Sequence, residues 1–164
     1  ADFRGWVDAQ FDPGVTWKDI EWLRGQWSGD LVLKGVLDPE DARLAAGAGA
    51  DGIVVSNHGG RQLDGVSSGI AMTPRIVEAV GERFPVLMDG GVRSGMDVVK
   101  ALAAGAKAVL IGRPWIWALA GRGAAGLSAL LKTFRAEMHV AMALTGAPSI
   151  GDISPVIVDD AARE

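Results

Sequence analysis

The sequence predicts an α/β fold made of parallel βα units, the last four units of a (β/α)8 TIM barrel. Short apolar, β-branched runs alternate with helical stretches along the whole chain. The runs are continuous, as expected of strands that are covered on both faces in a parallel sheet. An internal repeat sets residues 35–57 against residues 91–113, and barrel units repeat in this way because each solves the same packing problem.

The four apolar runs are the expected strands, and "LVLKGV" and "PVLMDGG" are typical of them. Each is too short for a helix and is followed at once by glycine or polar residues. The expected strands cover 31–36, 52–57, 85–91 and 108–114.

The expected helices lie between these runs and after the last one. Thr16 is a suitable N-cap for the first, "DPED" opens the second, and Ser94 begins the fourth. Residues 1–14 are predicted to be the end of a loop that leads into the first helix. The expected helices cover 16–27, 38–48, 73–83, 94–104 and 123–144.

Composition excludes several classes of function. The net charge of −4 leaves no basic stripe for nucleic acid, and the absence of cysteine excludes disulfides and thiolate metal sites. With two histidines and no clustered carboxylates, no metal site is expected; His139, in the last helix, is predicted to be structural. No apolar run is long enough to cross a bilayer, so any membrane contact is expected to be peripheral.

Polar residues follow the end of every predicted strand. In a barrel, the carboxyl ends of the strands form the rim that holds the chemistry, so these side chains are expected to converge there. They are Lys34, Ser56, Asn57, His58, Arg61, Asp89, Arg93, Gly112 and Arg113.

Two glycine-rich turns, "DGGVRSG" and "IGRP", each lead toward the amino end of a helix and carry Arg93 and Arg113. Backbone N–H groups, helix dipoles and guanidinium groups together favour an anion, and barrels often hold phosphate at their last two loops. The turns therefore predict a phosphorylated cofactor. The alternative is that Gly91 and Gly112 only make tight turns and the arginines are solvated.

The segments "SNHGGRQLDG", "MDGGVRSGMDVVKALAAGAKAVLIGRP" and "FDPGVTWKDIEWLRGQW" resemble the carboxyl-terminal half of the FMN-dependent α-hydroxy-acid dehydrogenases and oxidases. Within that family, "GVLDPEDAR" and "MHVAMALTGAPSIGDI" are most similar to the respiratory enzymes that oxidise L-lactate. The resemblance covers nearly the whole chain. It implies that about half of the barrel, with its first four strands, lies upstream of residue 1.

The resemblance implies a role for each rim residue. Lys34 would lie at the N1 edge of the flavin, and Ser56 would bond the flavin or its ribityl chain. His58 would be the catalytic base and Arg61 the clamp on the substrate carboxylate. The ribityl and phosphate groups would be held by Asp89, Gly90, Gly91, Arg93, Gly112 and Arg113.

The proximity of His58 and Arg61 suits oxidation of a 2-hydroxy acid. The reaction needs a base near C2, histidine titrates near neutral pH, and a bidentate arginine fixes the carboxylate and so orients the C2–H bond. Hydride and carbanion routes need the same groups. The alternative is that both residues only satisfy backbone groups of a turn.

The resemblance further implies L-lactate oxidation to pyruvate, with electrons passed to a quinone of the respiratory chain, by a tetramer at the cytoplasmic side of the inner membrane. Residues 1–15 would end a mobile lid, and residues 16–164 would form the half-barrel. Residues 1–164 alone are expected to bind FMN weakly and to turn over no substrate. Oxidation of glycolate or mandelate, or a non-catalytic phosphate-binding half-barrel, remains an alternative.

Overall fold

A four-stranded parallel sheet forms the centre of the computed structural model, which describes residues 2–10 and 12–157. The strands are β1 (Val32–Val36), β2 (Gly52–Val55), β3 (Val86–Asp89) and β4 (Ala108–Leu110). They pair in the order β1-β2-β3-β4, so each connection is a single βα crossover between neighbours. The predicted parallel α/β arrangement is confirmed.

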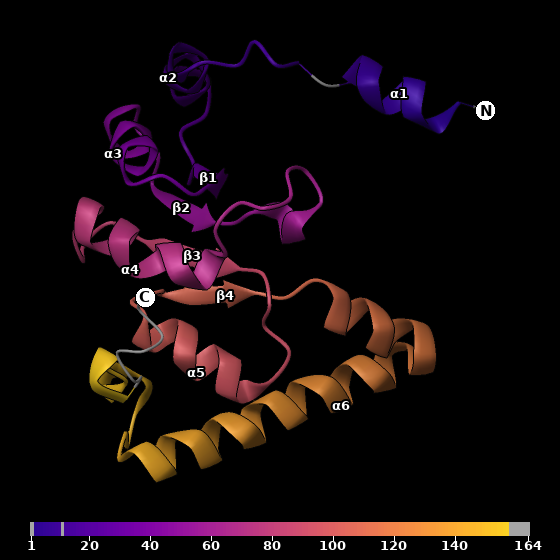
Figure 1. The fold of residues 1–164 in the computed structure, drawn as a ribbon, viewed down its shortest axis with the longest axis vertical. Coiled ribbons are helices and arrows are strands. Elements are labelled where there is room, and N and C mark those ends of the chain that lie inside the picture. The colour runs from indigo at the N-terminus through magenta and orange to yellow at the C-terminus, as the bar shows by residue number, and fades with distance from the viewer. Residues whose placement is uncertain (1, 11, 158–164) are drawn as a thin grey trace.

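Helices line the sheet in the same order as the strands (Figure 1). Ile53 and Val55 of β2 are fully buried, and they share a core cluster with Ala42 and Ile76 from the flanking helices. A second cluster joins Met88 of β3 to the last long helix. The helices are α1 (Phe3–Gln10), α2 (Trp17–Gln26), α3 (Pro39–Gly47), α4 (Gly69–Val80), α5 (Gly95–Ala103) and α6 (Arg113–Thr145). Short 3-10 turns are η1 (His58–Gly60), η2 (Ile150–Asp152) and η3 (Pro155–Ile157).

Three strands end earlier than the sequence predicted. β2, β3 and β4 stop at Val55, Asp89 and Leu110, because the glycine and polar residues that follow turn away from the sheet. The expected helix over 73–83 begins earlier, at Gly69, where the Ser68 hydroxyl accepts a hydrogen bond from the N–H of Ala71. The shorter strands leave more of the rim as loop.

The last helix differs most from the prediction of 123–144. α6 begins directly after β4, and its helical geometry breaks at Arg122 and Gly123, the latter with φ of 61° and ψ of −151°. The predicted helix is therefore the second of two segments, and the first carries the Arg113 side of the rim. Residues 3–10, expected in a loop, form α1, which stands apart from the sheet (Figure 1).

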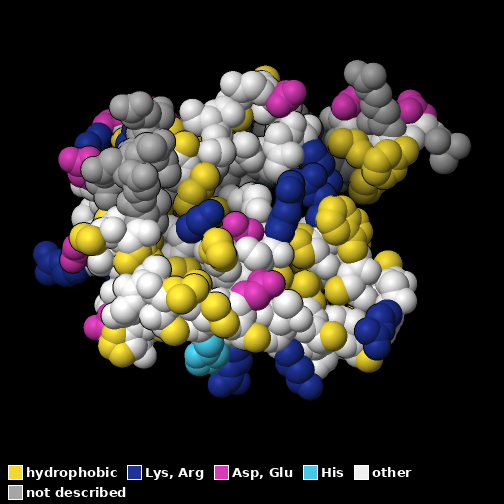
Figure 2. All heavy atoms as spheres, turned by 60° about the horizontal axis from the view of Figure 1, so that its bottom comes forward, with side chains coloured by type: hydrophobic (Ala, Val, Ile, Leu, Met, Phe, Trp, Pro, Cys, Tyr) yellow, Lys and Arg dark blue, Asp and Glu magenta, His cyan; other side chains and the backbone are white. Residues whose placement is uncertain are grey.

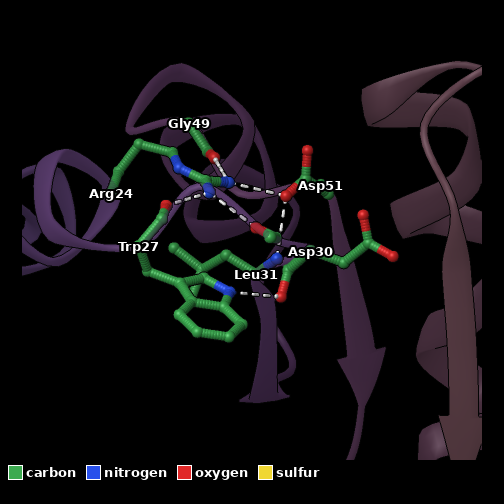
Figure 3. Close-up of polar contacts among 7 residues, drawn as sticks. Arg24, Trp27, Asp30, Leu31, Gly49 and Asp51 are labelled. Carbon is green, nitrogen blue, oxygen red and sulfur yellow. Dashed lines mark hydrogen bonds and ion pairs between the residues drawn. The ribbon is translucent and has the colours of Figure 1, made fainter.

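A network of hydrogen bonds and one ion pair connects α2 to the first βα unit (Figure 3). Arg24 Nη1 lies 2.6 Å from Asp51 Oδ2, and Arg24 also donates to the carbonyls of Trp27 and Gly29. The N–H of Leu31 donates to the same Asp51 oxygen at 2.8 Å. The Leu31 N–H and then Arg24 hold the pKa of Asp51 below its ordinary value, because both favour the carboxylate.

Candidate active site

A cavity of about 370 Å³ opens at the carboxyl ends of the strands, in the size range of small-molecule sites. Nine of the ten site residues predicted from the sequence line it: Lys34, His58, Arg61, Asp89, Gly90, Gly91, Arg93, Gly112 and Arg113. Figure 2 shows Lys and Arg side chains gathered at a hollow on one face of the molecule. The tenth, Ser56, is fully buried and lies outside the lining.

Ser56 joins two residues of the lining. Its Oγ accepts a hydrogen bond from Lys34 Nζ at 2.9 Å and another from the backbone N–H of His58 at 3.0 Å. Lys34 Nζ also lies 2.7 Å from Asp89 Oδ2. A lysine on β1, a serine after β2 and an aspartate on β3 therefore form one polar chain across the rim.

The loop that carries His58 is held in an uncommon conformation. His58 has a φ of 56°, the left-handed region that residues other than glycine rarely adopt. The contact with Ser56 fixes its N–H, and Asn57 Oδ1 accepts from the N–H of Gly59 at 3.0 Å. Arg61 follows on the same turn, and both residues line the cavity.

The two glycine turns differ in what their helices offer. At α5, the first N–H groups already have protein acceptors: Gly95 N–H donates to Glu137 Oε2 at 2.7 Å, and Arg93 N–H donates to Asp97 Oδ2 at 2.9 Å. At α6, the N-cap is Gly112, which supplies no side-chain cap. Pro114 has no N–H, and the Trp115 N–H donates to the Gly112 carbonyl at 3.2 Å, so the α6 amino end offers an anion the Arg113 N–H and the Arg113 guanidinium.

Asp89 has spare hydrogen-bonding capacity. Its side chain is 18% exposed, and Oδ1 is buried without a hydrogen-bond partner among the described residues. A buried carboxylate oxygen left in this way is costly unless a ligand donates to it. The site therefore suits a ligand with a hydroxyl group at Asp89 and an anionic group at the α6 end.

Some lining residues were missed by the sequence reasoning. Ile116 and Trp117 belong to the unpredicted first segment of α6, Leu110 ends β4, and Ile111 follows it. Together these residues form an apolar wall of the cavity, whereas the sequence had predicted only its polar and glycine residues. Nothing in residues 2–10 and 12–157 groups three or more His, Cys, Asp or Glu side chains as a metal ion would need.

A four-stranded parallel α/β sheet with a cationic, glycine-rich rim and a histidine near an arginine suits the binding of an anionic cofactor. The chain belongs to the FMN-dependent dehydrogenase family, whose pattern it matches over residues 1–160. The resemblance stated from the sequence is confirmed, and the cofactor of the family is FMN.

Curated relatives are named L-lactate dehydrogenase. The protein from Caulobacter sp. strain K31 is 61% identical over 157 residues, which are 96% of this chain and 41% of the relative. The protein from Pseudomonas aeruginosa strain LESB58 is 55% identical over 163 residues, 99% of this chain and 42% of the relative. The chain thus spans about two fifths of the length of these relatives.

Solved structures of similar fold include mandelate oxidases. Mandelate oxidase with (S)-2-phenylpropionate is 52% identical with a TM-score of 0.81, over 91% of this chain and 42% of that chain. A mandelate oxidase variant with a monooxide FMN adduct gives the same identity and TM-score, over 91% of this chain and 45% of that chain.

The described residues fit FMN. The free Asp89 oxygen suits a ribityl hydroxyl, the α6 end with Arg93 and Arg113 suits a phosphate, and the apolar wall suits a ring system. The Lys34 ammonium adds a fixed positive charge.

Proposed function

We propose that this chain carries the FMN-binding and substrate-binding rim of an enzyme that oxidises an L-2-hydroxy acid, with L-lactate converted to pyruvate. The observation that carries the proposal is the convergence of His58, Arg61 and Lys34 on one cavity. The names of the relatives support lactate as the substrate.

His58 and Arg61 divide the work on the substrate. The Arg61 guanidinium binds the carboxylate in a bidentate pair, which sets the position of C2 and of the hydroxyl group. As the alcohol is oxidised to the ketone, the His58 imidazole accepts one proton: the hydroxyl proton if the C2 hydrogen leaves with two electrons as hydride, or the C2 proton if the two electrons follow it. When bound, FMN supplies the acceptor for the two electrons that leave C2.

The remaining rim residues hold the cofactor. Lys34 would place a positive charge where negative charge develops on reduction. Asp89 forms an ion pair with this ammonium, and its other oxygen would accept a hydrogen bond from a ribityl hydroxyl. Ser56 supports Lys34 and His58 from below. The phosphate is held by Gly90, Gly91, Arg93, Gly112 and Arg113.

The rest of the barrel completes the site. Among the described strands, β1 and β4 each pair on one side only, and Val32 and Leu110 at these edges are 46% and 37% exposed. Four strands upstream of this chain would pair with both edges and close the barrel. Residues 1–164 alone then bind FMN weakly and oxidise no substrate.

We further propose a quinone as the electron acceptor, a tetramer as the assembly, and peripheral contact with the cytoplasmic face of the inner membrane near residues 1–15. Within the described ranges, no helix combines the length and the apolar character that crossing a membrane requires.

The test is anaerobic reduction of the flavin in the native protein, meaning the full gene product with any co-purifying chain. The flavin band should bleach with L-lactate and persist with D-lactate, and the electrons should pass to a quinone analogue. Mandelate is the second candidate substrate, since the similar solved structures are mandelate oxidases. Faster bleaching with mandelate or glycolate, with peroxide formed in air, would overturn the assignment to lactate.

A further inference from the structure

A bulge interrupts β1 at Gly35. Lys34 pairs with Val54 and Val36 with the next residue, Val55, so Gly35 has no partner on β2. Its φ is 101°, a conformation that glycine adopts readily and that other residues adopt only with strain. The bulge therefore depends on a glycine, and it lies at the rim, directly after the lysine of the cavity.

The imidazole of His58 fills the space at this bulge. An ideal Cβ built on Gly35 would lie 2.6 Å from His58 Nε2, 3.4 Å from Cε1 and 3.6 Å from Cδ2. These three ring atoms are the nearest neighbours of that position, so no other group occupies it. A side chain at residue 35 and the ring in its present place exclude each other.

The loop independently directs the ring toward this place. His58 is the one residue other than glycine with positive φ among the described residues, and its N–H is fixed by the buried Ser56 hydroxyl. Ser56 follows β2, the strand that pairs with β1. Two features therefore constrain the His58 imidazole: the fixed backbone of the loop after β2 and the space that Gly35 leaves on β1.

We propose that the Gly35 bulge is the seat of the His58 imidazole, which makes Gly35 a positioning residue for the base. Its consequence for catalysis rests on the proposed function, whereas the seating of the ring does not. Because Gly35 has no Cβ, the His58 ring can lie close to the β1 backbone. This determines the position of the imidazole relative to Lys34 and the cavity.

The first experiment is NMR of the 164-residue chain with labelled histidine. The chain has two histidines, and His139 lies exposed on α6 as an internal reference. Gly35→Ala should displace the His58 ring signals and leave those of His139 in place. Gly81→Ala is the matched control, because Gly81 also has positive φ, 79°, and its Cβ would meet nothing within 4 Å.

A double-mutant cycle separates the ring contact from backbone strain, which Gly35→Ala also introduces. In urea, Gly35→Ala should lower the unfolding midpoint more in the wild-type background than in a His58→Ala background, where the ring is absent. Gly81→Ala should cost the same in both. The proposal would be overturned if Gly35→Ala lowered the unfolding midpoint equally in the two backgrounds and left the His58 signals unmoved. A larger decrease in the midpoint when the ring is present, or displaced His58 signals, supports it.

The native protein supplies the catalytic readout. Gly35→Ala should lower kcat about tenfold or more and change its pH profile, while the flavin absorbance stays unchanged. Unchanged kcat and pH profile would overturn the positioning role. The NMR and unfolding results need neither flavin nor turnover, so failure of the proposed function would leave them standing and would be seen separately.

Discussion

Lys34 and Asp89 form an ion pair of 2.7 Å although β2 lies between their strands. The lysine reaches over the end of β2, where the Ser56 hydroxyl accepts a second hydrogen bond from its ammonium. The ammonium is thus held at two points, from β2 and from β3. This arrangement places a fixed positive charge at the centre of the rim.

Asp89→Asn tests this ion pair. The amide keeps the shape but removes the charge that holds Lys34, and one oxygen acceptor is replaced by a donor. Hydrogen bonds to charged groups contribute about 1.5 to 3 kcal/mol, so the Kd for FMN should rise about tenfold to a hundredfold. Flavin fluorescence titration of the native protein measures it. Asp30→Asn should leave the Kd unchanged, and an equal Kd for Asp89→Asn would contradict the assignment.

His58→Asn tests the base. Without the imidazole, the rate of flavin reduction by L-lactate should fall by about 10² to 10⁴, the usual contribution of a general base, with FMN still bound. Stopped-flow absorbance of the native protein gives the rate. His139→Asn is the matched control, since His139 is exposed on α6 and outside the cavity lining. A rate within twofold of wild type for His58→Asn would assign the base elsewhere.

Asp51 should make stability depend on pH. The Leu31 N–H and then Arg24 lower the pKa of Asp51 in the folded chain. Its carboxylate therefore contributes fully to the free energy of unfolding above the unfolded pKa, near 3.8, and this contribution is lost as pH falls through the folded pKa. Asp51→Asn should therefore destabilise the chain at neutral pH and weaken the loss of stability in acid. Urea unfolding at a series of pH values measures both.

The control for that series is Asp30→Asn. Asp30 lies beside the network, but Figure 3 draws no interaction at its carboxylate; only its carbonyl accepts, from Trp27 Nε1. This variant should follow the wild-type curve. Identical curves for Asp51→Asn and wild type would show that the network adds nothing to stability.

Gly95→Ala should destabilise the contact between α5 and α6. An added Cβ would overlap the Phe134 carbonyl and lie 2.5 Å from the N–H nitrogen of Met138, and backbone cannot yield as a side chain can. Overpacking costs about 1 to 3 kcal/mol, and the upper end is expected here. Thermal unfolding measures it. Gly25→Ala, where a Cβ meets nothing within 4 Å, should unfold at the wild-type temperature or above.

The sequence predicted the four-strand order, and nine of its ten predicted site residues line the cavity, because both follow from local patterns. Apolar runs define strands, and residues just after parallel strands share one rim. The first segment of α6 was missed because Gly121 and Gly123 interrupt its helical pattern, so "RPWIWALAGRG" reads as loop.

Contacts between strands could not be predicted. The Ser56 hydroxyl, on the first residue after β2, accepts hydrogen bonds from Lys34 and from the His58 backbone N–H, and neither contact follows from the local sequence pattern. The role of Gly35 is equally non-local: "LKGV" indicates a strand, and only pairing with β2 reveals the bulge and the ring that fills it. Such contacts depend on register, which the apolar pattern leaves open.

Comparison of the Kd of FMN with that of riboflavin, which lacks the phosphate, tests whether this rim binds FMN through its phosphate. In the native protein, stripped of flavin, FMN should bind more tightly than riboflavin. That difference should collapse in a variant carrying both Arg93→Ala and Arg113→Ala, with riboflavin binding little changed. Equal Kd values for the two flavins in the unaltered protein would contradict the account.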